Sequence, residues 1–141
     1  MTSASTELPT VVIALGSNLG NRLLYLRRAL FALGDVMRVV RASSVHETAP
    51  IDAPAGSPPF LNMVVAGYTR QPPLALLNEL QRIESRLGRR RGVRNAPRTI
   101  DLDLILYSSR VMRTGRLTIP HPRYRERPFV MEPLAELGLA I

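Results

Sequence analysis

The order in which apolar patterns change period constrains the fold of this chain most strongly. Alternating or continuous apolar runs, which are typical of strands, occur at residues 11–15, 36–46, 60–69 and 99–107. Two stripes with helical spacing lie between them: Leu23, Leu26, Leu30 and Leu33, then Leu76, Leu80, Ile83 and Leu87. The resulting order, βαββαβ, predicts an α+β fold of the ferredoxin-like type, in which an antiparallel sheet carries two helices on one face.

Glycines and prolines predict where the helices begin and end. Gly34 and Gly88 follow the two helical stripes, and Pro72-Pro73 precedes the second. Beyond the last strand, residues 111–117 predict an extra C-terminal hairpin and residues 128–137 a short final helix.

The length of 141 residues is typical of one domain. We expect residues 1–9 to form a flexible N-terminal tail and residues 10–141 a single domain. The absence of cysteine excludes disulfide frameworks, thiolate zinc sites and cysteine nucleophiles. The chain has neither an apolar run of membrane-spanning length nor a signal-peptide pattern. The expectation is therefore a cytoplasmic, monomeric protein that binds no membrane.

Charge narrows the class of ligand. All 19 basic residues are arginine and the net charge is +8. An arginine-rich genome accounts for most of the missing lysine, but the clustering of the arginines is a separate feature. One cluster holds Arg82, Arg86, Arg89, Arg90, Arg91, Arg94 and Arg98, and the other holds Arg116, Arg123, Arg125 and Arg127. Guanidinium groups bind phosphate in a two-point fashion, so the clusters favour a nucleic acid or a small phosphate ester.

Two carboxylates are the best candidates for metal ligands. Asp101 and Asp103 alternate with apolar residues on the last predicted strand, so both side chains point to the same face, about 7 Å apart. Mg²⁺ prefers such oxygen ligands and usually adds substrate phosphates. The alternatives are two exposed residues, or two ion pairs with neighbouring arginines.

The segments around this carboxylate pair suggest its chemistry. Arg98 stands at the start of the strand, and Arg89, Arg91 and Arg94 lie in the loop before it. Carboxylate-held Mg²⁺ facing guanidinium groups is typical of phosphoryl transfer. The alternative is a solvated basic loop. A second loop, residues 48–59, contains four prolines and is long enough to suggest a functional role.

Other polar residues carry weaker signals. Gln81 and Glu84 share one side of the second helix and could form an ordinary polar edge. His121 lies between two prolines and could contact phosphate, whereas His46 is interpreted as structural. The turn at residues 16–20 lacks the lysine and spacing of a Walker motif, so we expect a tight turn that could form part of a site wall.

These motifs together resemble the 6-hydroxymethyl-7,8-dihydropterin pyrophosphokinase family of folate biosynthesis. The strongest is the run Arg94-Asn95-Ala96-Pro97-Arg98-Thr99-Ile100-Asp101-Leu102-Asp103-Leu104-Ile105. Similar landmarks occur in the family's order at residues 14–20, 47–50, 60–62, 81–84 and 117–122, so the resemblance covers about 120 residues. It implies a ferredoxin-like pyrophosphokinase domain that transfers the β,γ-pyrophosphoryl unit of ATP to the hydroxymethyl group of the pterin and releases AMP.

The resemblance also implies residue roles. Asp101 and Asp103 match the ligands of two Mg²⁺ ions, and with Arg89 and Arg98 they match the catalytic set. The positions that match ATP-binding residues are Gln81, Glu84, Arg91, Arg98, Arg116, Thr118, His121 and Arg127. The positions that match the pterin pocket are Thr48, Ala49, Ile51, Phe60, Asn62, Asn95 and Phe129. Asn95 stands where the family usually has tryptophan. The implied partners are ATP and the pterin, without nucleic acid.

Three other functions compete with this interpretation. A basic RNA-binding module would suit the charge, but it predicts exposed aromatic residues on the sheet and no carboxylates there. A relative that binds pterin and nucleotide without catalysis would suit Asn95 and a shortened arginine loop. A small phosphatase on the same fold would release phosphate without a pterin.

Overall fold

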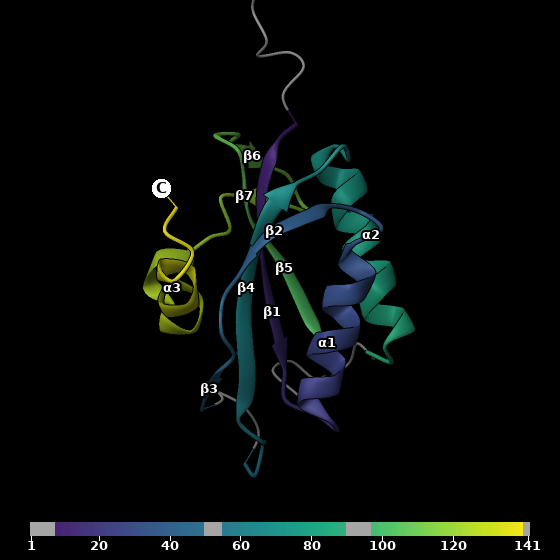
Figure 1. The fold of residues 1–141 in the computed structure, drawn as a ribbon, viewed down its shortest axis with the longest axis vertical. Coiled ribbons are helices and arrows are strands. Elements are labelled where there is room, and N and C mark those ends of the chain that lie inside the picture. The colour runs from purple at the N-terminus through teal and green to yellow at the C-terminus, as the bar shows by residue number, and fades with distance from the viewer. Residues whose placement is uncertain (1–7, 50–54, 90–96, 140–141) are drawn as a thin grey trace, which may run out of the picture.

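The computed structural model describes residues 8–49, 55–89 and 97–139, which form three layers (Figure 1). The middle layer is an antiparallel sheet with the strand order β2-β4-β1-β5, in which β3 also pairs with β4. Its strands are β1 (Thr10–Ser17), β2 (Arg38–Ala42), β3 (His46–Thr48), β4 (Phe60–Tyr68) and β5 (Asp101–Tyr107). This order is that of a ferredoxin-like sheet, so the predicted α+β fold class is confirmed.

Helices cover both faces of the sheet. Helices α1 (Arg22–Leu33) and α2 (Pro73–Arg86) lie on one face, and α3 (Pro128–Ala135) lies on the other (Figure 1). The predicted C-terminal hairpin is present as β6 (Met112–Arg113) and β7 (Thr118–Ile119), and η2 (Tyr124–Glu126) precedes α3. Helix α3 ends two residues earlier than predicted. No helix in the described ranges has the length and apolar character needed to cross a bilayer.

The central strand β1 separates two apolar cores. Val11, Ile13 and Leu15 are fully buried against the α1 and α2 side, whereas Val12 packs into the cluster that contains α3. Because side chains alternate along a strand, one short apolar run supplies both cores. Further along this side of β1, beyond Ala14, Gly16 has no side chain and leaves space for the site described below.

The predicted alternation along the last strand fails at one position. Leu102 and Leu104 share one face as predicted, and this face packs against α1 and α2. Tyr107 joins them there, whereas Leu106 packs on the α3 side. The pairing of β1 with β5 shifts between Val12 and Ile13, which oppose Leu106 and Leu104. Ile105 is therefore the extra residue of a β-bulge, which reverses the phase of the residues that follow.

The predicted strand at residues 36–46 is two strands. Ser43 interrupts it because its side chain takes over a backbone role: Val64 N–H donates to Ser43 Oγ (2.9 Å), and Ser43 N–H donates to the Val64 carbonyl (2.9 Å). Beyond this break, β3 pairs Thr48 with Phe60 and His46 with Asn62. The break thus lets the chain return to β4 and bring Thr48 to the site.

Candidate active site

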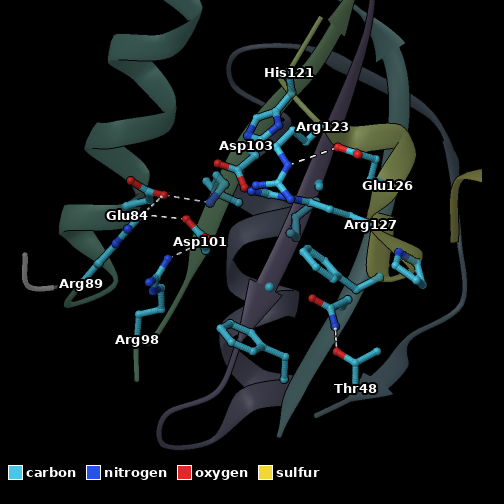
Figure 2. Close-up of a pocket in the computed structure, with 18 of the residues that line it drawn as sticks. Thr48, Glu84, Arg89, Arg98, Asp101, Asp103, His121, Arg123, Glu126 and Arg127 are labelled. Atoms are coloured by element: carbon cyan, nitrogen blue, oxygen red, sulfur yellow. Dashed lines mark hydrogen bonds and ion pairs between the residues drawn. The ribbon is translucent and has the colours of Figure 1, made fainter. Parts of the chain in front are cut away.

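A cavity of about 610 Å³ opens at the end of the sheet where β1 finishes and β4 and β5 begin. It lies on the α3 face and extends toward α2, so elements from both helical layers contribute side chains (Figure 2). Its principal polar and aromatic lining residues are Thr48, Phe60, Asn62, Gln81, Glu84, Arg89, Arg98, Asp101, Asp103, His121, Arg123, Glu126, Arg127 and Phe129.

Both oxygens of the Asp101 carboxylate face guanidinium groups. Arg89 Nη1 lies 2.8 Å from Oδ1, and Arg98 Nη1 lies 3.1 Å from Oδ2. These side chains are mostly buried, so their charges are screened less than those of a surface pair. The alternative that Asp101 makes ion pairs with nearby arginines is therefore realised.

Glu84 joins helix α2 to strand β5. Its Oε2 accepts hydrogen bonds from the Leu102 backbone N–H (2.8 Å) and from Arg89 Nη1 (2.5 Å). The side chain is buried, and this burial raises its pKa, although Leu102 and Arg89 act in the opposite direction. Glu84 therefore holds Arg89 beside Asp101. The alternative that Glu84 belongs to an ordinary polar edge of the helix does not describe these contacts.

Asp103 differs from Asp101 in its contacts. Among the described residues no side chain forms a hydrogen bond or ion pair with its carboxylate. Burial, then the charges of Asp101 and Glu84, raise its pKa from 3.8 to about 7, while Arg127 and Arg89 oppose the rise. A bound cation would supply a positive charge that stabilises the ionised carboxylate.

The donor set suits a hard cation. Asp101 and Asp103 offer carboxylate oxygens, the ligands that Mg²⁺ prefers. The described parts of the chain contain no group of three or more His, Cys, Asp or Glu placed to hold a metal ion by themselves. Mg²⁺ is commonly bound by one or two carboxylates together with substrate phosphates.

The opposite end of the cavity combines an amide with two aromatic rings. Asn62 Nδ2 donates to Thr48 Oγ1 (2.6 Å), which orients the amide and leaves its Oδ1 beside Gly16. Phe60 and Phe129 line the same end, from β4 and α3. A flat ring with hydrogen-bonding edges fits these features, because aromatic side chains can stack on the ring and the buried amide can form hydrogen bonds with one of its edges.

The C-terminal segment contributes His121 and Arg127, which lie near the carboxylates of β5 (Figure 2). His121 Nδ1 donates to the Pro122 carbonyl (2.9 Å), so Nε2 accepts hydrogen bonds when the ring is neutral. Burial and the charge of Arg127 lower the pKa of His121. Arg127 also lies over the Phe129 ring, 5.6 Å from its centre, which connects the charged and aromatic ends of the cavity.

Two residues of the predicted ATP set lie outside the lining. Arg116 Nη2 donates to Asn78 Oδ1 (2.6 Å) and Gln81 Oε1 (3.4 Å), so Arg116 reaches the cavity only through Gln81. Thr118 belongs to β7 and is half-buried. The predicted residues Ile51, Arg91 and Asn95 lie outside the described residues.

The structure adds lining residues to which the sequence assigned no specific role. Arg123 and Glu126 form an ion pair (3.1 Å) at the cavity rim. Arg123 belonged to a recognised arginine cluster, but nothing in its spacing showed that it faces the cavity. Gly16 lies within the turn interpreted as a possible site wall, and alternation along β1 would have placed it on the wall with Ala14.

An α+β domain whose cavity sets paired carboxylates against guanidinium groups has the features of a phosphate-transferring enzyme. Residues 12–139 match the family model of 7,8-dihydro-6-hydroxymethylpterin-pyrophosphokinase. The chain belongs to this family.

Relatives of known identity agree with this assignment. The chain is 46% identical over 127 residues to the 2-amino-4-hydroxy-6-hydroxymethyldihydropteridine pyrophosphokinase of Bacillus subtilis, covering 89% of this chain and 75% of that protein. It is 42% identical over 135 residues to the folate synthesis bifunctional protein of Arabidopsis thaliana, covering 94% of this chain but 28% of that protein.

A solved structure shows the same fold. The crystal structure of Plasmodium falciparum HPPK-DHPS A437G with pteroate superposes with a TM-score of 0.67 at 14% identity, over 89% of this chain and 38% of that one. The chain therefore spans about two fifths or less of these larger relatives.

Proposed function

We propose that this chain transfers the β,γ-pyrophosphoryl unit of ATP to 6-hydroxymethyl-7,8-dihydropterin, the reaction of its family. The hydroxyl oxygen of the pterin forms a bond to the β-phosphorus, the bond between that phosphorus and the oxygen bridging to the α-phosphorus breaks, and AMP leaves. The hydroxyl proton is released to solvent. One observation carries the proposal: a cavity joins Asp103, whose carboxylate has no hydrogen-bond or ion-pair partner among the described residues, to a pocket of aromatic rings and an amide.

The aromatic end of the cavity is proposed as the pterin site. Phe60 and Phe129 stack on the ring, while Asn62 Oδ1 accepts hydrogen bonds from the amide edge of the pterin. Thr48 fixes the orientation of Asn62, because its hydroxyl accepts from Nδ2 at 2.6 Å. A ring without the matching edge would leave the buried Asn62 unsatisfied, so this pairing confers specificity.

The charged end is proposed as the triphosphate site. Asp101 and Asp103 would hold Mg²⁺, and we propose two ions. When bound there, Mg²⁺ would supply positive charge that offsets the negative charge of the phosphate groups. Arg89 and Arg98 now neutralise Asp101, and in the complex these guanidinium groups bind phosphate oxygens instead. Arg127 and His121 face the same space and stabilise the leaving AMP phosphate.

The proposed adenosine site lies toward α2. Gln81 lines the cavity there and Arg116 is hydrogen-bonded to it, so both can contact the nucleotide after a side-chain rotation. We propose that the protein acts as a monomer, with ATP and the pterin as its partners and no nucleic acid.

The decisive experiment is an AMP-release assay with ATP and MgCl₂, with and without the pterin. Release of AMP that depends on the pterin supports the transfer. Phosphate release without the pterin would indicate a phosphatase, and tight binding of both ligands without AMP would indicate a non-catalytic relative. Asp103→Ala is the matched negative control, with its fold checked by circular dichroism.

A further inference from the structure

A buried asparagine joins the two walls of the cavity. Asn18 follows the last residue of β1, and its side chain is fully buried. Its Oδ1 accepts from the Arg98 backbone N–H (2.8 Å), and its Nδ2 donates to the Pro58 carbonyl (3.3 Å). The Asn18 backbone N–H also donates to the Arg98 carbonyl (3.1 Å).

The place of Asn18 in the sheet explains this double contact. Strand β1 lies between β4 and β5 and is antiparallel to both, so both neighbours begin where β1 ends (Figure 1). Pro58 leads into β4, which carries Phe60 and Asn62. Arg98 leads into β5, which carries Asp101. One amide therefore holds the segments that enter the aromatic wall and the charged wall.

We propose that Asn18 is a positioning residue that sets the distance between the pterin wall and the phosphate wall. This inference rests on the proposed function of the cavity. Each substrate contacts mainly its own wall, so a relative shift of the walls leaves each separate affinity nearly intact. Such a shift misaligns the hydroxyl oxygen and the β-phosphorus, and misplacement by about 1 Å lowers rates by about a hundredfold. Asn18 therefore acts on kcat more than on either KM.

Asn18→Asp breaks only the side-chain contact with Pro58. The carboxylate keeps an acceptor for the Arg98 N–H but has no hydrogen to donate to the Pro58 carbonyl. We expect kcat for AMP release to fall at least tenfold, while the dissociation constants of the pterin and of a non-hydrolysable ATP analogue change less than threefold. Asn18→Ala removes both contacts, and we expect a larger fall in kcat.

Asn21→Ala is the matched control. Asn21 lies in the same turn and caps α1, since its Oδ1 accepts from the Leu24 N–H (3.2 Å). It is exposed and lies outside the cavity lining, so its loss lowers the melting temperature and leaves kcat within threefold of the unaltered protein.

The outcomes separate the two hypotheses. If the unaltered protein releases no AMP with the pterin, the proposed function fails. If it does, and Asn18→Asp matches Asn21→Ala with lower stability but unchanged kcat, Asn18 is merely structural and the inference fails. Weaker binding of either substrate with unchanged kcat overturns it as well. All assays are run well below each variant's melting temperature, so that only folded protein contributes.

Discussion

Arg89 and Asp101 form an ion pair in which Nη1 lies 2.8 Å from Oδ1. The other carboxylate oxygen faces Arg98, so the two guanidinium groups compete with a cation for Asp101. Nucleotide phosphates offer those groups new anionic partners. For the proposed triphosphate site, we therefore expect nucleotide and divalent cation to bind together more tightly than either one binds alone.

The first prediction concerns Arg98. Arg98→Ala removes a guanidinium group from the charged end, and we expect a loss of transition-state stabilisation on the order of 2–4 kcal/mol, measured as kcat for AMP release. Arg86→Ala, at the exposed end of α2, is the control for charge alone and should retain full activity. A change confined to KM would contradict the role assigned to Arg98.

The second prediction concerns the stability of the metal-free protein. Burial, Asp101 and Glu84 raise the pKa of Asp103 to about 7, so ionised Asp103 destabilises the fold above that pH. This penalty shrinks as the pH falls toward the pKa of the unfolded chain. Asp103→Asn should therefore raise the free energy of unfolding at pH 8 by on the order of 1–3 kcal/mol, and by less at pH 5.

Urea denaturation in EDTA at the two pH values measures this effect, and the AMP-release assay should show that Asp103→Asn is inactive. A variant that is less stable than the unaltered protein at pH 8 would show that the Asp103 carboxylate makes favourable contacts in the folded state.

The third prediction concerns Gly16. A Cβ atom at this position would lie 3.1 Å from Asn62 Oδ1 and 3.4 Å from Phe60 Cδ1. Gly16→Ala should therefore weaken binding of the pterin about tenfold, while binding of an ATP analogue stays unchanged in isothermal titration calorimetry. At Gly115 an added Cβ meets no atom within 4 Å, so Gly115→Ala serves as the control. Equal loss of both affinities would point to general distortion of the sheet.

The fourth prediction concerns pH and His121. Burial and Arg127 lower the pKa of His121, so its ring is neutral at neutral pH and Nε2 has no proton to donate. A bound phosphate would raise this pKa again, so binding takes up a proton. Nucleotide affinity should increase as the pH falls below the ordinary histidine value of 6.5.

The comparison with His121→Gln isolates this effect, because the phosphate groups of ATP titrate equally with both proteins. Affinities are measured in EDTA from pH 5.5 to pH 8. Identical pH profiles for the two proteins would contradict phosphate contact by His121.

Local patterns were enough to predict the sheet order and the shared face of Asp101 and Asp103. The alternation of apolar and acidic residues around Leu102 and Leu104 depends only on neighbouring residues, and the folded strand keeps it. The bulge at Ile105 was not predictable in this way, because it depends on how β1 pairs with β5. The break at Ser43 was not predictable for a similar reason. The Ser43 hydroxyl can replace a backbone carbonyl as hydrogen-bond acceptor only when β4 lies beside it.

Most of the described residues proposed from the sequence line one cavity, but the contacts between them were not predictable. Motif order brought Asp101, Arg98 and Asn62 to attention, whereas the pairing of Arg89 with Asp101 depends on side-chain geometry across two elements. The same holds for Glu84, whose contact with the Leu102 N–H spans helix and strand. Spacing on one helix could indicate only that Glu84 shares a side with Gln81.

Arg127 and Phe129 come after every strand of the main sheet in the chain order. The ribosome therefore synthesises every strand of that sheet before the residues that complete this end of the cavity. A chain shortened before Arg127 would lack both the guanidinium group and the ring that connect the charged and aromatic ends.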